Sequence, residues 1–411
     1  MSRRRKGSGA VMFHTRIRLP DGHDWNLRQL YDDPPRRNQL LKPFHLAKRR
    51  PHCLCAEREP VRLIVRRVHG NFRLACYPGT TAIHDPRCYF YSAEEGRVGQ
   101  AYTLDAVEKQ PDGGIYVRLD QSLAAARPAV AQHISAERKQ ELRRGATRFQ
   151  RNTVKLQGLL QILWERAGLH RWHPRNPGDN RRYTEIVERL TDAAIDVRVP
   201  AGNLTERLYL PPPTYDDGGQ TLRATARRAG TQQAILIIGE FLSSRPTEFG
   251  EAVTLVCLRD CPLFLSKELW AGRTNSYRRP RRTDDERFWL IAICTLSPAG
   301  HVNVKDAAWM ECQRNYIVVH SAYERRVADL LVFQERTFVK PVRYDTTEED
   351  AVFPDFVLND VRGGPYPMEV WGLDTPAYLA RMVEKRAHYG ARLWEWNACK
   401  GEEVPPFPPE A

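Results

Sequence analysis

Two short apolar runs near the end of the chain, each carrying one acidic residue, constrain its folding most. The first run, Pro354–Leu358, contains Asp355, and the second, Met368–Gly372, contains Glu369. Between them lie Gly363-Gly364 and two prolines, a composition typical of a loose turn between strands. Because alternate residues of a strand share a face, the pattern predicts a β-hairpin with two carboxylates among apolar neighbours.

Paired strands would let Asp355 and Glu369 converge on one hard cation, and oxygen ligands of this kind suit Mg²⁺ or Mn²⁺. Phosphodiester hydrolysis uses such an arrangement, because the metal activates a water molecule and stabilises charge on the phosphate. We therefore expect a catalytic magnesium or manganese site at this hairpin.

The residues around the hairpin predict further elements in a definite order. Ser321 and Glu324 fit a capping box at the start of a helix, so Glu324 has a structural interpretation beside a catalytic one. The other elements are a strand over 338–341, a helix from Pro376 to about Tyr389 and a strand over 392–396. The predicted order is therefore α-β-β-β-α-β.

This order, with the two acids, resembles the core of the PD-(D/E)XK nuclease superfamily, or restriction-endonuclease-like fold. The superfamily has a lysine two residues after the second acid, where this chain has Trp371. That lysine positions the nucleophile or stabilises charge, and it sometimes lies on the following helix, which makes Lys385 the natural substitute. Tyr378, Arg381, Lys385 and His388 share one helical face and could address a phosphate; the alternative is an ordinary solvated basic face.

Cysteine and histidine residues in the N-terminal part predict a second metal site. Cys53 and Cys55 form one pair and His84 and Cys88 another, which matches the ligands of a tetrahedral structural zinc site. Strands over 61–65 and 72–76, around a turn at 69–71, would bring the pairs together as in a zinc ribbon. Cys76 and His69 are alternative ligands, and a group of buried free cysteines is the alternative to a metal site.

Composition and charge indicate a cytoplasmic protein with a polyanionic partner. The net charge is +13, and residues 1–100 hold 20 Lys and Arg against 9 Asp and Glu, which favours nucleic acid, DNA first. Neither an apolar signal region nor a run long enough for a membrane helix is found. Nine cysteines without an export signal favour a reducing compartment.

The middle of the chain predicts helices over 154–167 and 182–193, followed by strands over 234–241, 253–258 and 287–294. An exposed loop there, with Arg278, Arg279, Arg281 and Arg282, is suited to phosphate contact. We predict an α+β multidomain chain that begins with a basic irregular segment (1–40), in which Pro34-Pro35 mark a break. The further parts are a zinc-binding β module (41–125), a helical basic region (126–215), a β-rich middle domain (216–318), the nuclease-like domain (319–400) and a proline-rich tail (401–411).

Several segments together resemble bacterial proteins catalogued as domain of unknown function eleven-seventy-three, commonly carried on mobile elements. The segments are Cys53-Leu54-Cys55, the His84 and Cys88 pair, and residues 159–169, 338–341 and 354–358. The functional expectation is a metal-dependent DNA endonuclease or nickase. The alternative is a DNA-binding accessory or regulatory protein whose nuclease-like fold does not cleave. A homo-oligomer or a partner encoded by the mobile element is a further expectation.

Overall fold

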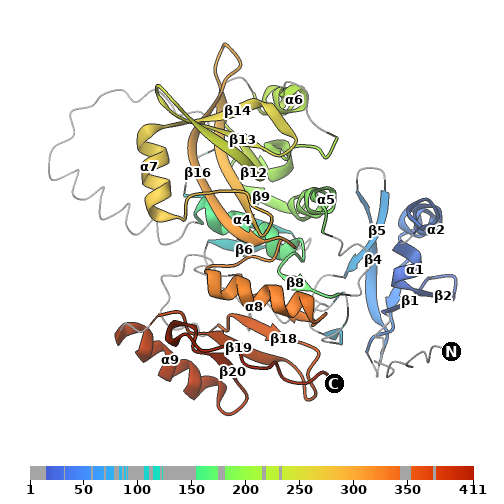
Figure 1. Cartoon of the computed structure of the whole chain (residues 1–411). Coiled ribbons are helices and arrows are strands. Elements are labelled where there is room, and N and C mark those ends of the chain that lie inside the picture. Colours follow the sequence, from blue (N-terminus) through green and yellow to red (C-terminus); the bar gives the residue numbers. More distant parts are fainter. Residues whose placement is uncertain are drawn as a thin grey trace, which may run out of the picture. The chain divides into compact units, whose positions relative to one another are not determined.

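The computed structural model describes residues 15–31, 33–56, 59–68, 71–77, 83–85, 88, 90, 106–110, 114–120, 123, 154–174, 181–214, 219–230, 234–342, 353–373 and 376–411 (Figure 1). The chain divides into two compact units. Unit 1 comprises residues 1–97 and 175–179, and unit 2 comprises residues 98–174 and 180–411. None of the helices in the described ranges combines the length and apolar character that a membrane crossing requires.

Unit 1 is built on a five-stranded sheet in the order β2-β1-β3-β4-β5. Its elements are β1 (Arg16–Arg18), β2 (Asp24–Asn26), α1 (Leu27–Tyr31), α2 (Pro34–Leu46), β3 (His52–Cys53), β4 (Val61–Val68) and β5 (Asn71–Cys76). Strands β4 and β5 form the predicted hairpin, with Val68 opposite Asn71. Ile17, Leu41 and Leu63 are fully buried and join one core.

The prediction of an irregular segment over 1–40 is wrong for its described residues, which form two strands, one helix and the start of another. Pro34 and Pro35 were interpreted as a break, yet they open α2. Proline is tolerated at the first helical positions because its missing N–H has no partner there anyway. Asp33 caps the helix by accepting a hydrogen bond from the backbone N–H of Arg36.

The middle of unit 2 is a closed β-barrel. Its strands are β12 (Ile235–Thr247), β13 (Gly250–Leu255), β14 (Leu258–Ser266), β15 (Glu286–Leu296) and β16 (Val302–Gln313). They follow the order β12-β13-β14-β16-β15, and β15 pairs back with β12, which closes the ring. Closure removes the exposed edges of an open sheet. The β-rich middle domain is thus present, and its closure was not predicted.

Both faces of this barrel are buried, which explains why β12 and β15 read as nearly continuous apolar runs. Ile237 and Leu290 belong to the barrel interior, whereas Ile238 and Ile291 belong to a second core outside it. Helix α4 (Leu156–Arg166) covers that outer face, and its Trp164 meets Trp289 of β15 edge-on at 5.4 Å. Alternation along each strand therefore supplies two cores at once.

The predicted helices at 154–167 and 182–193 are found as α4 and α5 (Tyr183–Ala194). The region is nevertheless mixed rather than purely helical, because β8 (Arg171–Trp172), β9 (Val197–Val199), β10 (Gly202–Asn203), η2 (Leu204–Glu206) and β11 (Leu208–Tyr209) accompany them. The sheet β10-β9-β7-β6 includes β6 (Val107–Lys109) and β7 (Ile115–Val117). Helices α6 (Gln220–Ala229) and α7 (Lys267–Ser276) complete the barrel's surroundings.

The C-terminal part contains the six elements in the predicted order. They are α8 (Ala322–Phe333), β17 (Phe338–Val339), β18 (Phe356–Leu358), β19 (Tyr366–Val370), α9 (Pro376–Tyr389) and β20 (Trp394–Trp396). The sheet order is β20-β19-β18-β17-β8, with β19 and β20 parallel and the other pairs antiparallel. Helix α8 packs on it through Val327 and Leu331 (Figure 1). Strand β8, from outside the predicted domain, extends the sheet.

The proline-rich end of the chain packs on this domain. After η4 (Ala398–Lys400), the ring of Phe407 lies 5.3 Å from that of Trp394. The indole N–H of Trp394 donates to the carbonyl of Pro406 over 3.1 Å, and the backbone N–H of Ala411 donates to the carbonyl of Asp360 over 2.7 Å. Residues 401–411 therefore belong to the C-terminal core rather than forming a separate tail.

Candidate metal centre and candidate catalytic cluster

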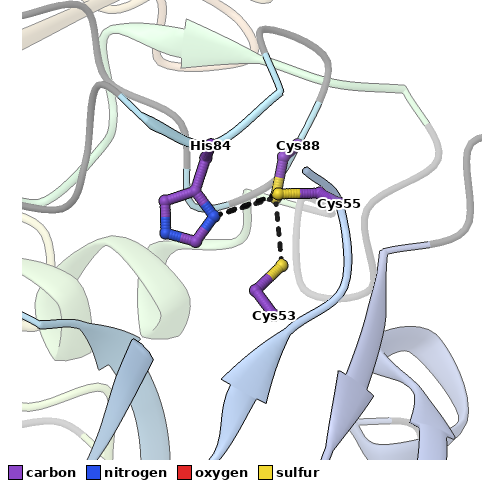
Figure 2. A group of neighbouring side chains, drawn as sticks. All are labelled: Cys53, Cys55, His84 and Cys88. Carbon is purple, nitrogen blue, oxygen red and sulfur yellow. Dashed lines mark hydrogen bonds between the residues drawn. The ribbon is translucent and has the colours of Figure 1, made fainter. Parts of the chain in front are cut away.

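Cys53, Cys55, His84 and Cys88 come together in unit 1, as Figure 2 shows. Cys53 lies on β3, which pairs with both β1 and β4, so the sheet fixes its position. Cys55 follows two residues later, and His84 and Cys88 approach from the other segment. Three of the four residues are buried and Cys55 is half-buried. The predicted grouping of these four residues is confirmed.

The distances fit a single small cation. The Sγ atoms of Cys53 and Cys88 are 3.6 Å apart, and Nδ1 of His84 lies 3.2 Å from Sγ of Cys55 and 3.7 Å from Sγ of Cys88. One ligand atom from each residue lies within 4.8 Å of the others. Zinc–sulfur bonds of about 2.3 Å in a tetrahedron place sulfurs about 3.8 Å apart. The cluster can therefore hold a metal such as zinc.

The electrostatics of the cluster also suit a cation. Hydrogen bonds from Cys53 and Cys88 hold the pKa of the Cys55 thiol below its usual value, whereas burial raises the pKa of Cys88. The hydrogen bond with Cys55 raises the pKa of Cys53 to about 12. A bound divalent ion would lower the pKa of all three thiols, since only thiolates bind metals strongly.

Backbone N–H groups support the thiols as in metal sites generally. Asp85 N–H donates to Sγ of Cys55 and Phe90 N–H donates to Sγ of Cys88, each over 3.4 Å. Such outer contacts orient ligands and stabilise thiolate charge. The alternative ligands His69 and the side chain of Cys76 lie outside the described residues. Cys257 and Cys261, a second cysteine pair, belong to unit 2, whereas this cluster belongs to unit 1.

In unit 2, the predicted hairpin brings Asp355 and Glu369 onto neighbouring strands. Phe356 of β18 pairs with Met368 of β19. In this antiparallel register Asp355, just before β18, lies opposite Glu369. The backbone N–H of Asp355 donates to the carbonyl of Met368 over 2.9 Å, and Oδ2 of Asp355 accepts from Val370 N–H over 2.8 Å. Both acids are buried, with 6% and 1% of their surfaces exposed.

Lys385 of α9 reaches this hairpin. Its Nζ donates to both carboxylate oxygens of Glu369, over 2.7 and 2.8 Å, and to the carbonyl of Phe353 over 2.8 Å. An ammonium group has three N–H donors, so these contacts use all of them. Lys385 therefore contacts one of the two predicted acids, and its role as the substitute lysine stays a prediction. It acts on Glu369 rather than presenting a free donor to a phosphate.

Glu324 of α8 forms a second carboxylate–lysine pair with Lys340, the residue that follows β17. Its Oε2 lies 3.0 Å from Nζ of Lys340, which follows β17 and is fully buried, and accepts the backbone N–H of His320 over 2.9 Å. Ser321 caps α8 through the N–H of Glu324 at 3.1 Å, as predicted. Burial alone would raise the pKa of Glu324, but Lys340 and His320 hold that pKa well below its usual value.

Tyr378 of α9 lies among these acids. Its hydroxyl donates to the carbonyl of Val370 and accepts from Gly372 N–H, both over 3.2 Å. Burial raises the pKa of this hydroxyl, and the nearby charges of Asp355, Glu369 and Glu324 raise it further. We call Glu324, Lys340, Asp355, Glu369, Tyr378 and Lys385 the carboxylate–lysine cluster.

Other predicted site residues lie elsewhere. Arg381 and His388 are exposed on α9, whereas Lys385 on the same helix is buried. The loop arginines are engaged within the barrel: Arg278 with Glu311 and Glu286, Arg279 with Glu251, Arg281 with Glu286, and Arg282 with Glu240. Their contact with nucleic acid stays a prediction.

Sequence reasoning missed Lys340, and it included Tyr378 only as part of a helical face. A signal for Lys340 exists: it ends the apolar run Phe338-Val339, where a charged residue usually needs a partner of opposite sign. Nothing in the sequence indicated Glu324 as that partner, because the two residues belong to a helix and a strand that meet only in the folded domain.

Comparison with known families identifies the family of this chain. The family described as "Protein of unknown function (DUF1173)" matches residues 27–399. The chain belongs to this family. A search of curated proteins finds no match. The matched range includes both the cysteine–histidine cluster and the carboxylate–lysine cluster, so both are features of the DUF1173 region of the chain.

Proposed function

We propose that this DUF1173 protein is a metal-dependent DNA phosphodiesterase, an endonuclease or nickase. The proposal rests mainly on the acidic hairpin, where Asp355 and Glu369 are buried on adjacent segments and Lys385 contacts Glu369, with a second buried pair, Glu324 and Lys340, in the same domain. Paired acids that could hold a divalent cation, with a lysine beside them, suit phosphodiester hydrolysis, and the element order resembles the PD-(D/E)XK core. The basic charge of the chain supplies the affinity for DNA.

In this proposal Asp355 and Glu369 would hold a Mg²⁺ or Mn²⁺ ion, which would supply an activated water and stabilise charge on the phosphate. Lys385 orients Glu369 through hydrogen bonds to both carboxylate oxygens, so we assign it as a positioning residue. Glu324 stays ionised because Lys340 and His320 lower its pKa. Tyr378 fixes the end of β19 through Val370 and Gly372.

A structural zinc ion at Cys53, Cys55, His84 and Cys88 belongs to the same proposal. Three thiols and an imidazole select zinc over harder ions. The zinc site would hold β3 against the segment with His84 and Cys88, and so stabilise the fold of unit 1. We further propose that the protein is cytoplasmic and acts on a mobile element. It would work as a homo-oligomer or with a partner encoded by that element.

The deciding experiment compares DNA cleavage by the wild type and matched variants with Mg²⁺, Mn²⁺ or EDTA, on supercoiled, linear and single-stranded DNA. Asp355→Asn and Glu369→Gln should abolish cleavage and leave DNA binding intact. Glu384→Gln is the control, because Glu384 is an exposed acid next to Lys385 on α9. Cleavage that survives in both site variants would overturn the assignment of these acids.

One observation favours a second candidate, a DNA-binding accessory protein that does not cleave. Glu369 is 1% exposed, and Lys385 occupies both of its oxygens, so the pair is already neutral without a metal. Under this alternative the cluster is a structural ion-pair network. Wild-type protein that binds DNA but cuts none of the substrates with either metal would establish it.

A further inference from the structure

Five arginines gather over three buried glutamates at the barrel. Glu240, Glu286 and Glu311 have 0%, 3% and 8% of their surfaces exposed. The arginines, which we call the arginine rim, are Arg278, Arg281, Arg282, Arg287 and Arg325. By strand alternation, Glu286 and Glu311 point to the same side as Phe288 and Trp309 of the barrel interior, whereas Glu240, opposite Trp289, points toward the second core outside the barrel.

The glutamates accept hydrogen bonds from one edge of the guanidinium group of each of these loop arginines. Arg281 donates to Glu286 through both Nε and one Nη, and the Nη contact spans 2.7 Å. Arg278 donates to both oxygens of Glu311, over 2.7 and 2.8 Å, and to Glu286 over 3.1 Å. Arg282 donates to Glu240 through Nε over 2.9 Å. These charge-assisted bonds fix where each guanidinium group lies.

The backbone of the loop is held as well. Pro280 is buried, and the indole N–H of Trp309 donates to the carbonyl of Arg278 over 2.7 Å. The hydroxyl of Thr283 accepts from the N–H of Glu286 over 3.1 Å. The arginines are therefore fixed at both ends, by the loop backbone and by the buried carboxylates.

In the part of the chain that the structure describes, Arg281 and Arg282 each keep guanidinium donors without an acceptor. A guanidinium group has five N–H donors. In the described ranges, the second Nη of Arg281 and both Nη groups of Arg282 donate to no acceptor. The side chains of Arg281 and Arg282 are 53% and 38% exposed. Fixed, outward-facing donor edges of this kind match the oxygens of a phosphate.

We propose that the arginine rim is a contact surface for a phosphodiester backbone, and that Glu286 and Glu311 are positioning residues that hold its guanidinium groups ready. This inference rests on the nucleic-acid partner of the proposed function and names the surface that meets it. A guanidinium group that is fixed before binding loses less conformational entropy when it contacts a phosphate.

The rim also adjoins the carboxylate–lysine cluster through one helical turn. Arg325 and Glu324 are consecutive residues in the first turn of α8. Arg325 donates to Glu311 over 2.9 Å and also to Glu286, whereas Glu324 pairs with Lys340. A DNA backbone on the rim therefore lies beside the helix start that carries one acid of the proposed catalytic cluster.

Substitutions in the loop distinguish an effect of net charge from an effect of arginine positioning, because the two predict opposite changes in DNA affinity. Asp284 and Asp285 are exposed acids in the same loop, and Glu286 follows them as a buried acid. Removing any one of these charges makes the protein equally more positive. If only net charge matters, each change strengthens DNA binding. If Glu286 and Glu311 position the arginines, the buried changes weaken binding while the exposed changes strengthen it.

The experiment measures binding of a fluorescent DNA duplex to the full chain in EDTA by anisotropy, over a series of salt concentrations. We expect Asp285→Asn to bind somewhat more tightly than wild type and Glu311→Gln to bind roughly tenfold more weakly, because its charge-assisted hydrogen bonds are removed. Arg281→Gln with Arg282→Gln should reduce the slope of log affinity against log salt by about 0.9 for every phosphate that is no longer neutralised. Binding by Glu311→Gln that equals or exceeds wild type overturns the proposal.

Loss of fold is controlled by a second pair of variants. Arg281→Lys and Arg282→Lys keep the charge but lose the fork that spans carboxylate and phosphate, so affinity should still fall; unchanged affinity overturns the proposal. Because EDTA prevents metal-dependent cleavage, the outcomes separate. Rim variants that weaken binding by a protein that never cuts DNA support the rim and refute the nuclease. If wild-type protein cleaves DNA but the rim variants bind DNA as tightly as wild type, the nuclease is supported and the rim is refuted.

Discussion

The cysteine–histidine cluster and the carboxylate–lysine cluster are both candidate metal sites, but they treat charge in opposite ways. In unit 1, three thiols and an imidazole converge with their ligand atoms within 4.8 Å of one another. In unit 2, Glu369 and Glu324 each face a buried lysine, so each carboxylate has a counter-ion from the protein itself. A cation completes the first site, whereas at the second it competes with a lysine.

This difference teaches how much each fold depends on a metal. Buried thiolates without a counter-charge are costly, so unit 1 gains most from an ion. The carboxylate–lysine cluster is already neutralised, so unit 2 keeps its fold with or without one. Experiments on metal content, stability and DNA binding can test this contrast between the two units.

The largest effect should follow zinc removal. Structural zinc sites contribute about 10–16 kcal/mol of apparent binding energy, which is more than a typical domain's stability. We expect purified protein to hold one zinc per chain by metal analysis, and Cys53→Ser or Cys88→Ser to lose it with melting of unit 1. Cys399→Ser is the control, because Cys399 is an exposed cysteine. A Cys88→Ser protein with full zinc content and stability would show that the ligand set is wrong.

A smaller but clear effect should follow Lys385→Met. The change leaves Glu369 buried without its counter-charge, which costs about 3–5 kcal/mol. Glu369→Gln in the same chain should restore much of that loss in urea unfolding.

The effect of Mg²⁺ on the stability of Lys385→Met tests whether these acids bind a cation. If Asp355 and Glu369 bind Mg²⁺, the ion replaces the missing ammonium, so Mg²⁺ should stabilise Lys385→Met more than it stabilises wild type. Equal stabilisation of both proteins would argue against a cation at these acids and would favour the accessory alternative.

Acid should weaken the glutamate ion pairs next. The pKa of Glu324 is well below its usual value, because Lys340 and His320 outweigh its burial. A hydrogen bond from Arg281, with the charges of Arg325 and Arg278, lowers the pKa of Glu286 to about 2. Their stabilisation is therefore complete above the unfolded pKa of about 4.3 and is lost as the pH falls through the folded values.

The measurement is the free energy of unfolding in urea between pH 6 and pH 2. We expect it to fall below about pH 4.5, and the fall to be shallower in Glu324→Gln. Glu384→Gln, at an exposed acid, should follow the wild-type curve. A wild-type curve that the Glu324 variant reproduces would mean that the Glu324–Lys340 pair does not contribute.

The smallest effect concerns the basic surface of unit 1. Deleting residues before Lys42 would remove the buried Ile17 and Leu41, so substitution is the sounder test. Lys42 and Lys48 are exposed, and Lys42→Gln with Lys48→Gln should lower the salt slope of DNA binding by about 0.9 for each phosphate that these lysines neutralise. An unchanged slope would show that these lysines do not meet phosphate.

The local pattern predicted much of what is found. Paired spacing predicted the ligands Cys53, Cys55, His84 and Cys88, because two short pairs joined by a hairpin have few ways to meet. The capping residue Ser321 and the apolar alternation predicted α8 and the acidic hairpin. Where the pattern failed, at Pro34-Pro35, the same residues suit a break or a helix start, and only the preceding cap at Asp33 decides between them.

Long-range contacts decided the rest. Barrel closure requires β15 to pair with β12, and no local signal encodes which distant strand becomes a neighbour. The exposed loop arginines were interpreted as free phosphate ligands, yet their partners Glu240, Glu286 and Glu311 lie on strands whose side chains face the loop only after closure.

The sequence by itself determined which residues of this protein carry chemistry: thiols in pairs, acids on a hairpin and a lysine on the next helix. Only the tertiary structure decided their electrical state. Lys385 neutralises Glu369, and Lys340 neutralises Glu324, because helices and strands far apart in the chain bring opposite charges into one buried place. A buried charge needs a partner within a few ångströms, and such proximity belongs to the fold rather than to the order of residues.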